Sequence, residues 1–113
     1  MLDSAKHAPP TPAEQFASDV KMLVEKKIVD APDYWLANAT KGGQCDGALV
    51  ATMLLNMARN FEPATTTVGS LQVLIARKVF RSTTYWKEKA TAGGKCGGDN
   101  VRTVIRNFIQ VTE

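Results

Sequence analysis

Few residues of this chain belong to the types that perform catalysis. The single histidine, His7, lies in residues 1–10, which we expect to be a flexible tail, so no Ser-His or Cys-His pair can form inside a fold. Two cysteines, Cys45 and Cys96, are too few for a metal site. No pair of carboxylates stands in an apolar setting that would raise a pKa for acid–base work. We therefore expect no enzymatic activity and no cofactor.

Cys45 and Cys96 stand 51 positions apart, each between a Gly-Gly pair and a predicted helix. The favoured interpretation is that both are small buried apolar residues at the start of that helix. A disulfide between them is the first alternative, and it would indicate an oxidising compartment. A reactive thiol is the second, because a helix N-terminus lowers the pKa of a thiol.

Two aromatic pairs, Tyr34-Trp35 and Tyr85-Trp86, are the best candidates for a binding surface. Adjacent residues on a helix point about 100° apart, so one ring of each pair can face the core while the other stays near the surface. Packing of both rings in the core is the simpler hypothesis. An exposed ring in each pair would instead provide a flat platform for stacking on sugars or bases.

Two glycine-rich segments, residues 40–47 and 91–98, each run into a predicted helix and can present backbone N–H groups to an anion. They lack the spacing of a P-loop, because Lys89 stands at the first glycine position and Cys96 at the Ser/Thr position. A tight interhelical turn explains the glycines equally well. The predicted ligand-binding residues combine these segments with the aromatic pairs: Tyr34, Trp35, Asn38, Thr40, Gly42, Gly43, Tyr85, Trp86, Lys89, Thr91, Gly93, Gly94 and Lys95.

An internal repeat must position these residues. A shift of 51 aligns residues 19–61 with residues 70–112 without a gap, and both tyrosines, both tryptophans and both cysteines fall into register. We therefore predict an all-α domain of two tandem three-helix repeats packed about a pseudo-twofold axis. Repeat one is placed at 11–61, a linker at 62–66 and repeat two at 67–113.

Each repeat is predicted as a helix, a short helix, a glycine-rich turn and a final helix. Thr11 and Glu14 form a capping box at the first helix, and Thr66 or Thr67 is expected to cap its counterpart. The short helix carries the Tyr-Trp pair and ends near Ala39 or Ala90. The final helix begins around Asp46 or Gly98.

Charge differs between the repeats. Residues 19–61 carry five basic and five acidic side chains, whereas residues 70–112 carry eight basic and two acidic ones. This imbalance is typical of a solvated basic face, or of contact with an anionic partner. No run of apolar residues is long enough to span a membrane, and residues 1–12 lack the apolar core of a signal peptide. A cytoplasmic protein, a piece of a longer chain and export by another route all remain open.

The segment from Val20 to Leu36, VKMLVEKKIVDAPDYWL, resembles a repeat module of bacterial and phage cell-wall hydrolases and related surface proteins. The module combines a Leu-Val helix, a Lys-Gly-Ile-Ile turn, a Ser-Pro-Asp-Tyr-Trp motif and a final helix that starts with Gly-x-x-Val-x-Gly. In this chain Lys27 replaces the turn glycine, Cys45 and Cys96 replace the valine, and Thr83 stands opposite Pro32. The resemblance implies binding of envelope glycan.

The expected function is therefore that of a non-catalytic module that binds cell-wall glycan, such as peptidoglycan, or another polysaccharide. Its mechanism would be stacking on Trp35 and Trp86, or on the paired tyrosines, with Lys87, Lys89 and Lys95 attracting anionic groups. The alternatives are a protein that sequesters a small anionic ligand such as a nucleotide, and a protein–protein adaptor. We expect a monomer or homodimer, and neither nucleic-acid binding nor membrane insertion.

Overall fold

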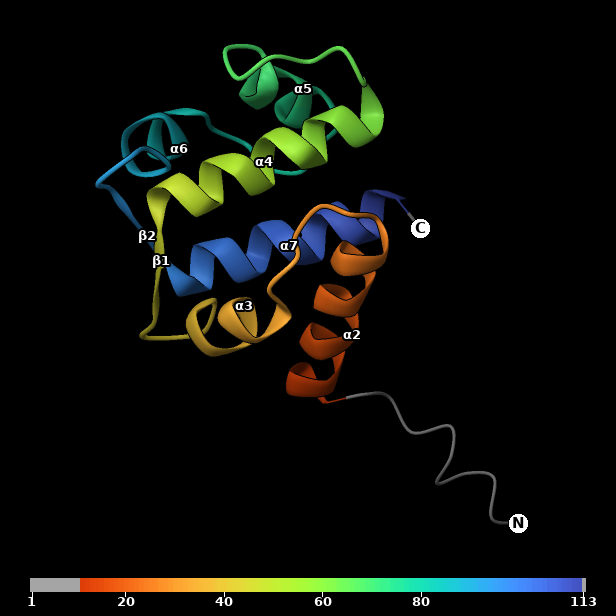
Figure 1. Ribbon diagram of the computed structural model, residues 1–113, viewed down its shortest axis with the longest axis vertical. Helices are drawn as coiled ribbons and strands as arrows, with labels where there is room; N and C mark the ends of the chain where they lie inside the picture. The colour runs from red at the N-terminus through yellow and green to blue at the C-terminus, as the bar shows by residue number, and fades with distance from the viewer. Residues whose placement is uncertain (1–10, 113) are drawn as a thin grey trace.

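The computed structural model describes residues 11–112, which form six helices and one two-stranded antiparallel sheet (Figure 1). The helices are α2 (Pro12–Glu25), α3 (Pro32–Asn38), α4 (Gly47–Phe61), α5 (Ser70–Ala76), α6 (Thr84–Lys89) and α7 (Gly98–Thr112), and the strands are β1 (Gln44–Asp46) and β2 (Lys95–Gly97). The domain is thus mainly α, as predicted. Residues 1–10, the predicted tail, and residue 113 lie outside the described residues. None of the helices within 11–112 has the length and apolar character of a transmembrane span.

The first helix, α2, begins with the predicted capping box. The Thr11 side chain accepts a hydrogen bond from the backbone N–H of Glu14 at 3.2 Å, and the Glu14 carboxylate accepts one from the backbone N–H of Thr11 at 2.9 Å. The bond from the Thr11 backbone also lowers the pKa of the Glu14 carboxyl. Two otherwise unpaired N–H groups are satisfied in this way, and the helix start is fixed.

The corresponding helix of the second half, α5, starts later than predicted. It begins at Ser70 after Gly69, which provides no side-chain cap, so the prediction of a cap at Thr66 or Thr67 is wrong. Instead, the Thr67 carbonyl accepts a hydrogen bond from the Ser70 hydroxyl at 2.9 Å. The residues before α5 form a turn, in which the Gly69 N–H donates to the Thr66 carbonyl at 3.0 Å. Arg59 of α4 donates to the Thr65 carbonyl at 2.8 Å.

Helices α4 and α7 form the centre of the domain and lie one above the other in Figure 1. Each starts directly after a strand, at Gly47 and Gly98, which confirms the predicted starts. Phe61 of α4 and Phe108 of α7 pack edge to face, with ring centroids 5.6 Å apart. The buried apolar side chains of these two helices make up much of the core: Val50, Met53, Leu54, Met57, Ala58, Val101, Val104, Ile105, Phe108 and Ile109.

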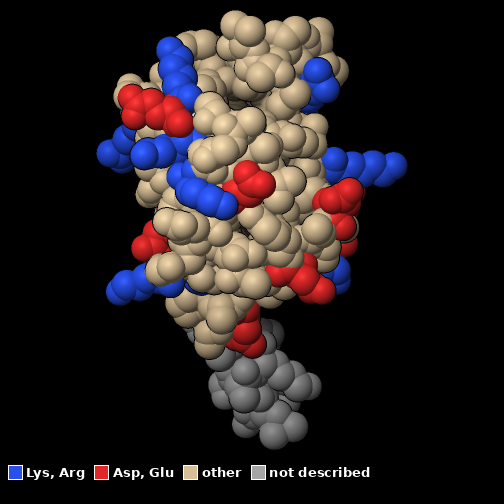
Figure 2. Space-filling model, turned by 60° about the vertical axis from the view of Figure 1, so that its left-hand side comes forward, with Lys and Arg blue, Asp and Glu red and all other residues tan. Residues whose placement is uncertain are grey.

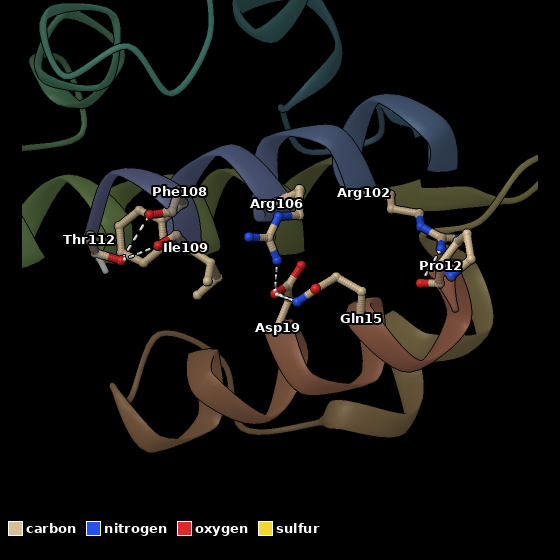
Figure 3. Close-up of polar contacts among 8 residues, drawn as sticks. All are labelled: Pro12, Gln15, Asp19, Arg102, Arg106, Phe108, Ile109 and Thr112. Atoms are coloured by element: carbon tan, nitrogen blue, oxygen red, sulfur yellow. Dashed lines mark hydrogen bonds and ion pairs between the residues drawn. The ribbon is translucent and has the colours of Figure 1, made fainter. Parts of the chain in front are cut away.

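The outer helices pack across the molecule: α2 contacts α7, and α5 contacts α4. Figure 3 shows how polar contacts hold α2 on α7. The Arg106 guanidinium pairs with the Asp19 carboxylate at 2.6 Å, and Gln15 donates to the same oxygen at 3.2 Å. One turn earlier on α7, Arg102 donates to the Pro12 carbonyl at 2.8 Å and covers the Phe16 ring. The first helix of each half is therefore bound to the last helix of the other.

The sequence predicts that the glycine-rich segments form simple turns. In the structure each segment also contains a short strand, and the two strands pair. Strands β1 and β2 are antiparallel, and Cys45 lies directly opposite Cys96 in their register. The backbone N–H of Gly47 donates to the Gly94 carbonyl, and that of Gly98 donates to the Gly43 carbonyl, both at 2.8 Å. This ribbon joins the two halves by backbone hydrogen bonds at the point where α4 and α7 begin.

Candidate functional site

Both tryptophans lie in the core. Trp35 is 4% exposed and Trp86 is 5% exposed, so the prediction that they form open stacking platforms is wrong. Each indole packs edge to face against the preceding tyrosine, at 5.1 Å for Tyr34 and 4.9 Å for Tyr85. The tyrosines are only half-buried, so in each pair they are the aromatic residues with access to the surface.

The tyrosine hydroxyls connect the short helices to the ribbon. The Tyr34 hydroxyl accepts a hydrogen bond from the backbone N–H of Asp46 at 2.7 Å. The Tyr85 hydroxyl accepts one from the backbone N–H of Gly97, also at 2.7 Å. Each tyrosine ring is held in place at its far end and leaves its face beside a hollow in the surface.

The first of these hollows, here hollow 1, has a volume of about 450 Å³ and lies between α3, the turn before it and one face of α4. Its lining is mostly apolar, with a lysine, an aspartate, a threonine and an asparagine among it. The lining residues are Val24, Lys27, Ile28, Val29, Asp30, Ala31, Tyr34, Trp35, Leu49, Thr52, Met53 and Asn56. A space of this size is typical of small-ligand sites.

Hollow 2 has a volume of about 610 Å³ and lies in the same position beside α6 and α7. Each of its lining residues stands 51 positions after a residue that lines hollow 1. These residues are Phe80, Arg81, Ser82, Tyr85, Trp86, Asn100, Thr103, Val104 and Asn107. The two hollows therefore have the same construction from separate parts of the chain.

The hollows differ in chemistry at their rims. Arg81 of hollow 2 stands where hollow 1 has Asp30, and Asn100 stands where hollow 1 has Leu49. Hollow 1 is therefore acidic and apolar at these positions, whereas hollow 2 is basic and polar. On the face in Figure 2, lysine and arginine side chains are interspersed with acidic ones, so no patch of a single sign covers that face.

The turn that borders each hollow has an unusual backbone. Lys27 and Lys78 have positive φ angles of 62° and 65°, a left-handed conformation that glycine adopts without cost. The Asn56 amide donates to the Ile28 carbonyl at 3.0 Å, and the Asn107 amide makes the same bond to Val79 at 2.9 Å. A side chain of the last helix thus holds the turn in each half.

Several backbone N–H groups of the glycine-rich segments, which the sequence predicts as an anion site, are taken by hydrogen bonds within the protein. The backbone N–H groups of Gly43 and Gly94 donate to Thr40 and Thr91 within their own turns. Those of Gly47 and Gly98 donate across the ribbon. A side chain at Gly47 would collide with the carbonyls of Lys89 and Thr91, and one at Gly98 with those of Asn38 and Thr40. These glycines are required by close backbone packing, and their N–H groups are already used.

The structure separates the predicted site residues into two groups. The aromatic pairs line the hollows, whereas the remaining predicted residues lie at the ends of α3 and α6, in the turns and in the ribbon, and line neither hollow. This second group comprises Asn38, Thr40, Gly42, Gly43, Lys89, Thr91, Gly93, Gly94 and Lys95. Asn38 has a structural role, since its amide donates to the Tyr34 carbonyl at 2.8 Å. Lys89 and Lys95 are exposed.

Cys45 and Cys96 are free thiols and completely buried, which confirms the favoured interpretation and not the disulfide. Burial raises the pKa of each thiol from 9.0 to about 11, and the neighbouring Cys96 adds to the effect on Cys45. For Cys96 the Asp46 carboxylate raises the pKa further, while Lys89 lowers it. Reactive cysteines have a lowered pKa and access to solvent, so these two have neither property.

Several lining residues were not selected from the sequence. Leu49, Thr52 and Asn56 of α4 border hollow 1, and Asn100, Thr103 and Asn107 of α7 border hollow 2. The sequence signal that could have identified them is the recurrence of Thr52 as Thr103 and of Asn56 as Asn107 after 51 positions. Thr52 and Thr103 are exposed, so identity at that position is not required by the core.

Comparison of the chain with protein-family models, curated proteins and solved structures found no match. No group of three or more His, Cys, Asp or Glu side chains within residues 11–112 is arranged to hold a metal ion. The chemistry of the two hollows must therefore be inferred from their own residues.

Proposed function

We propose that the chain contains two copies of one helical unit, related by a pseudo-twofold axis that passes between Cys45 and Cys96. The support comes from contacts that recur 51 positions apart: the tyrosine–ribbon bond, the asparagine–turn bond and the paired glycine bonds of the ribbon. Neither unit is self-contained, because each first helix packs on the last helix of the other unit. The two units share one core.

On this basis we propose that the protein is a non-catalytic binding domain with two ligand sites, hollow 1 and hollow 2. The observation that carries the proposal is the position-by-position match of their linings. Core residues repeat because packing requires them, whereas Thr52 and Thr103 are exposed, and each hydroxyl also donates to a carbonyl of its own helix. Two concave surfaces with an aromatic ring, hydroxyl groups and amides suit ring-shaped polar ligands.

The ligand class that we propose is glycan of the bacterial envelope or another polysaccharide, to which the resemblance of residues 20–36 to cell-wall hydrolase repeats also points. In this mechanism the half-buried Tyr34 and Tyr85, rather than the tryptophans, contact the sugar rings. Thr52 and Thr103 contribute hydroxyl oxygens. A polymer of repeated units can occupy both hollows at once, and the second contact then benefits from a high effective concentration.

A pull-down on purified cell wall tests this function with rim variants that leave the core intact. Leu49 is 43% exposed at the rim of hollow 1, so Leu49→Glu introduces a charge without removing buried contacts. Val68 is 92% exposed and lines neither hollow, so Val68→Glu is the matched control. We expect the combination of Leu49→Glu with Asn100→Glu to reduce binding by about tenfold or more, while Val68→Glu binds normally. Full binding by a folded double variant would reject the proposal.

A further inference from the structure

Hollow 2 continues into a neighbouring depression on the same helix. That depression has a volume of about 450 Å³ and is lined by Pro12, Asp99, Arg102, Thr103, Arg106 and Asn107. It shares Thr103 and Asn107 with hollow 2. The two spaces adjoin each other along α7, and we refer to them together as the α7 groove.

Three arginines line the α7 groove. Arg81 belongs to hollow 2, and Arg102 and Arg106 belong to the neighbouring depression. Arg102 and Arg106 are four positions apart on a helix, so their side chains leave the same face about one turn apart. The only carboxylate among the lining residues is that of Asp99. The groove therefore presents positive charge at more than one point along its length.

Contacts with α2 hold the two arginines of α7 in position. Figure 3 shows Arg106 directed to Asp19 and Arg102 directed to Pro12. Asp19 offsets part of the charge of Arg106, so Arg102 and Arg81 carry most of the attraction for an anion. A guanidinium has five N–H donors in a fixed plane, and the single bond from Arg102 to the Pro12 carbonyl leaves donors for a second partner.

The equivalent positions of the first unit have none of this charge. Asp30 stands for Arg81, Ala51 for Arg102 and Leu55 for Arg106. Arg102 and Arg106 also hold α2 on α7, so these contacts account for two of the three exchanges, but not for the exchange of Asp30 for the exposed Arg81. Only the second unit therefore has the basic groove.

We propose that the α7 groove binds a ligand that carries phosphoryl groups, with Arg81 and Arg102 as its charged contacts and Asn100 as a polar contact. Arginine is suited to this role because its planar donors match phosphate oxygens in pairs. Two sources supply this chemistry: a free nucleotide, and a phosphate-bearing polymer of the cell envelope. The inference rests on the proposed function in that it takes hollow 2 to be a ligand site.

Titration calorimetry and thermal unfolding of the full chain test the proposal with three probes: inorganic pyrophosphate, ADP and a glycerol-phosphate polymer. We expect at least one probe to bind and to raise the melting temperature, since a ligand stabilises the state that it binds. Binding of ADP without the polymer identifies the nucleotide source, and the reverse identifies the polymer. If none of the three probes binds at low ionic strength, the proposal is wrong.

Arg81→Gln is the decisive variant, because Arg81 is exposed and its loss does not disturb the contacts between α2 and α7. We expect it to weaken binding of the active probe by about tenfold or more, as for the loss of a charge-assisted hydrogen bond. Lys21→Gln, which removes one positive charge from an exposed residue that lines neither hollow nor the neighbouring depression, is the matched control and should bind normally. Equal affinity of Arg81→Gln and the wild type would overturn the assignment.

These results are distinguishable from failure of the glycan proposal. If the wild type binds purified wall, the Leu49→Glu/Asn100→Glu variant does not, and none of the three probes binds, the glycan function stands and the phosphoryl site is rejected. A protein that binds a probe through Arg81 but not purified wall has the phosphoryl site without the glycan function.

Discussion

Cys45 and Cys96 lie opposite each other at the centre of the two-stranded ribbon, and neither side chain has any exposure to solvent. Their register places the two thiols close to each other. With pKa values of about 11, both act as small apolar residues where the two halves of the chain meet.

The raised pKa of the thiols predicts a loss of stability at alkaline pH. Folding favours the protonated form, since the pKa is about 11 in the fold and 9.0 ordinarily. The stabilisation is therefore complete below pH 9 and is lost as the pH rises toward 11. Chemical denaturation at pH 7, 9 and 10.5 should show a steeper decline for the wild type than for the Cys45→Ala/Cys96→Ala variant. Parallel declines would show that the thiols do not contribute.

The same burial predicts slow alkylation. Iodoacetamide at pH 8 should modify the native protein far more slowly than the protein in urea, because the native thiols are both protonated and covered. Mass spectrometry over time provides the rate. Rapid labelling of either cysteine in the folded protein would contradict the burial of the ribbon centre.

Removal of a tyrosine hydroxyl should have the same cost in both units. Tyr34→Phe leaves the backbone N–H of Asp46 without its partner, and Tyr85→Phe does the same to Gly97. Loss of a bond to a part-buried N–H costs about 1–3 kcal/mol of unfolding free energy. Urea denaturation of the two single variants measures it. A large cost for one variant and none for the other would argue against equivalent units.

Glycine at the left-handed turns should stabilise the protein. Lys27→Gly and Lys78→Gly relieve a positive φ angle that costs an L-residue about 1–2 kcal/mol, although glycine loses part of this gain through its greater freedom in the unfolded chain. We expect a net increase of up to about 1 kcal/mol at each site. Lys26→Gly, one position before, is the control and should be destabilising. A decrease for Lys27→Gly would contradict the assigned backbone.

The Asp19–Arg106 ion pair between α2 and α7 should contribute more to the free energy of unfolding than an exposed ion pair does. The Asp19 side chain is 1% exposed and the Arg106 side chain is 28% exposed. When Asp19 is removed, the guanidinium of Arg106 can therefore still reach water. We expect Asp19→Ala to cost about 1–3 kcal/mol, below the value for a fully buried pair. Asp99→Ala on the exposed face of α7 is the control and should change stability little. Hydrogen exchange of α2 would locate the effect.

Much of the fold is predictable because it rests on local rules and on the repeat. The capping box at Thr11, the short helices and the starts of α4 and α7 follow from turn and capping residues. The start of α5 is not predictable in this way, since the helix follows Gly69, which has no capping side chain. The strands were missed because their pairing depends on backbone contact between segments 51 positions apart.

The candidate site is less predictable than the fold. The aromatic pairs were identified, but the sequence does not reveal that the indoles face inward, because this depends on how the short helices rotate against α4 and α7. The sequence also does not reveal that the N–H groups of Gly43, Gly47, Gly94 and Gly98 have hydrogen-bond partners within the protein. Arg81 and Arg102 stand apart in the chain, and α7 brings them into one groove.

The central claim is that hollow 1 and hollow 2 are both ligand sites, and NMR titration of the labelled protein with soluble cell-wall fragments tests it most directly. The account predicts chemical-shift changes at Leu49 and Thr52 in the first unit and at Asn100 and Thr103 in the second. Changes confined to the glycine-rich segments, or their absence from both hollows while the fragments bind, would contradict it.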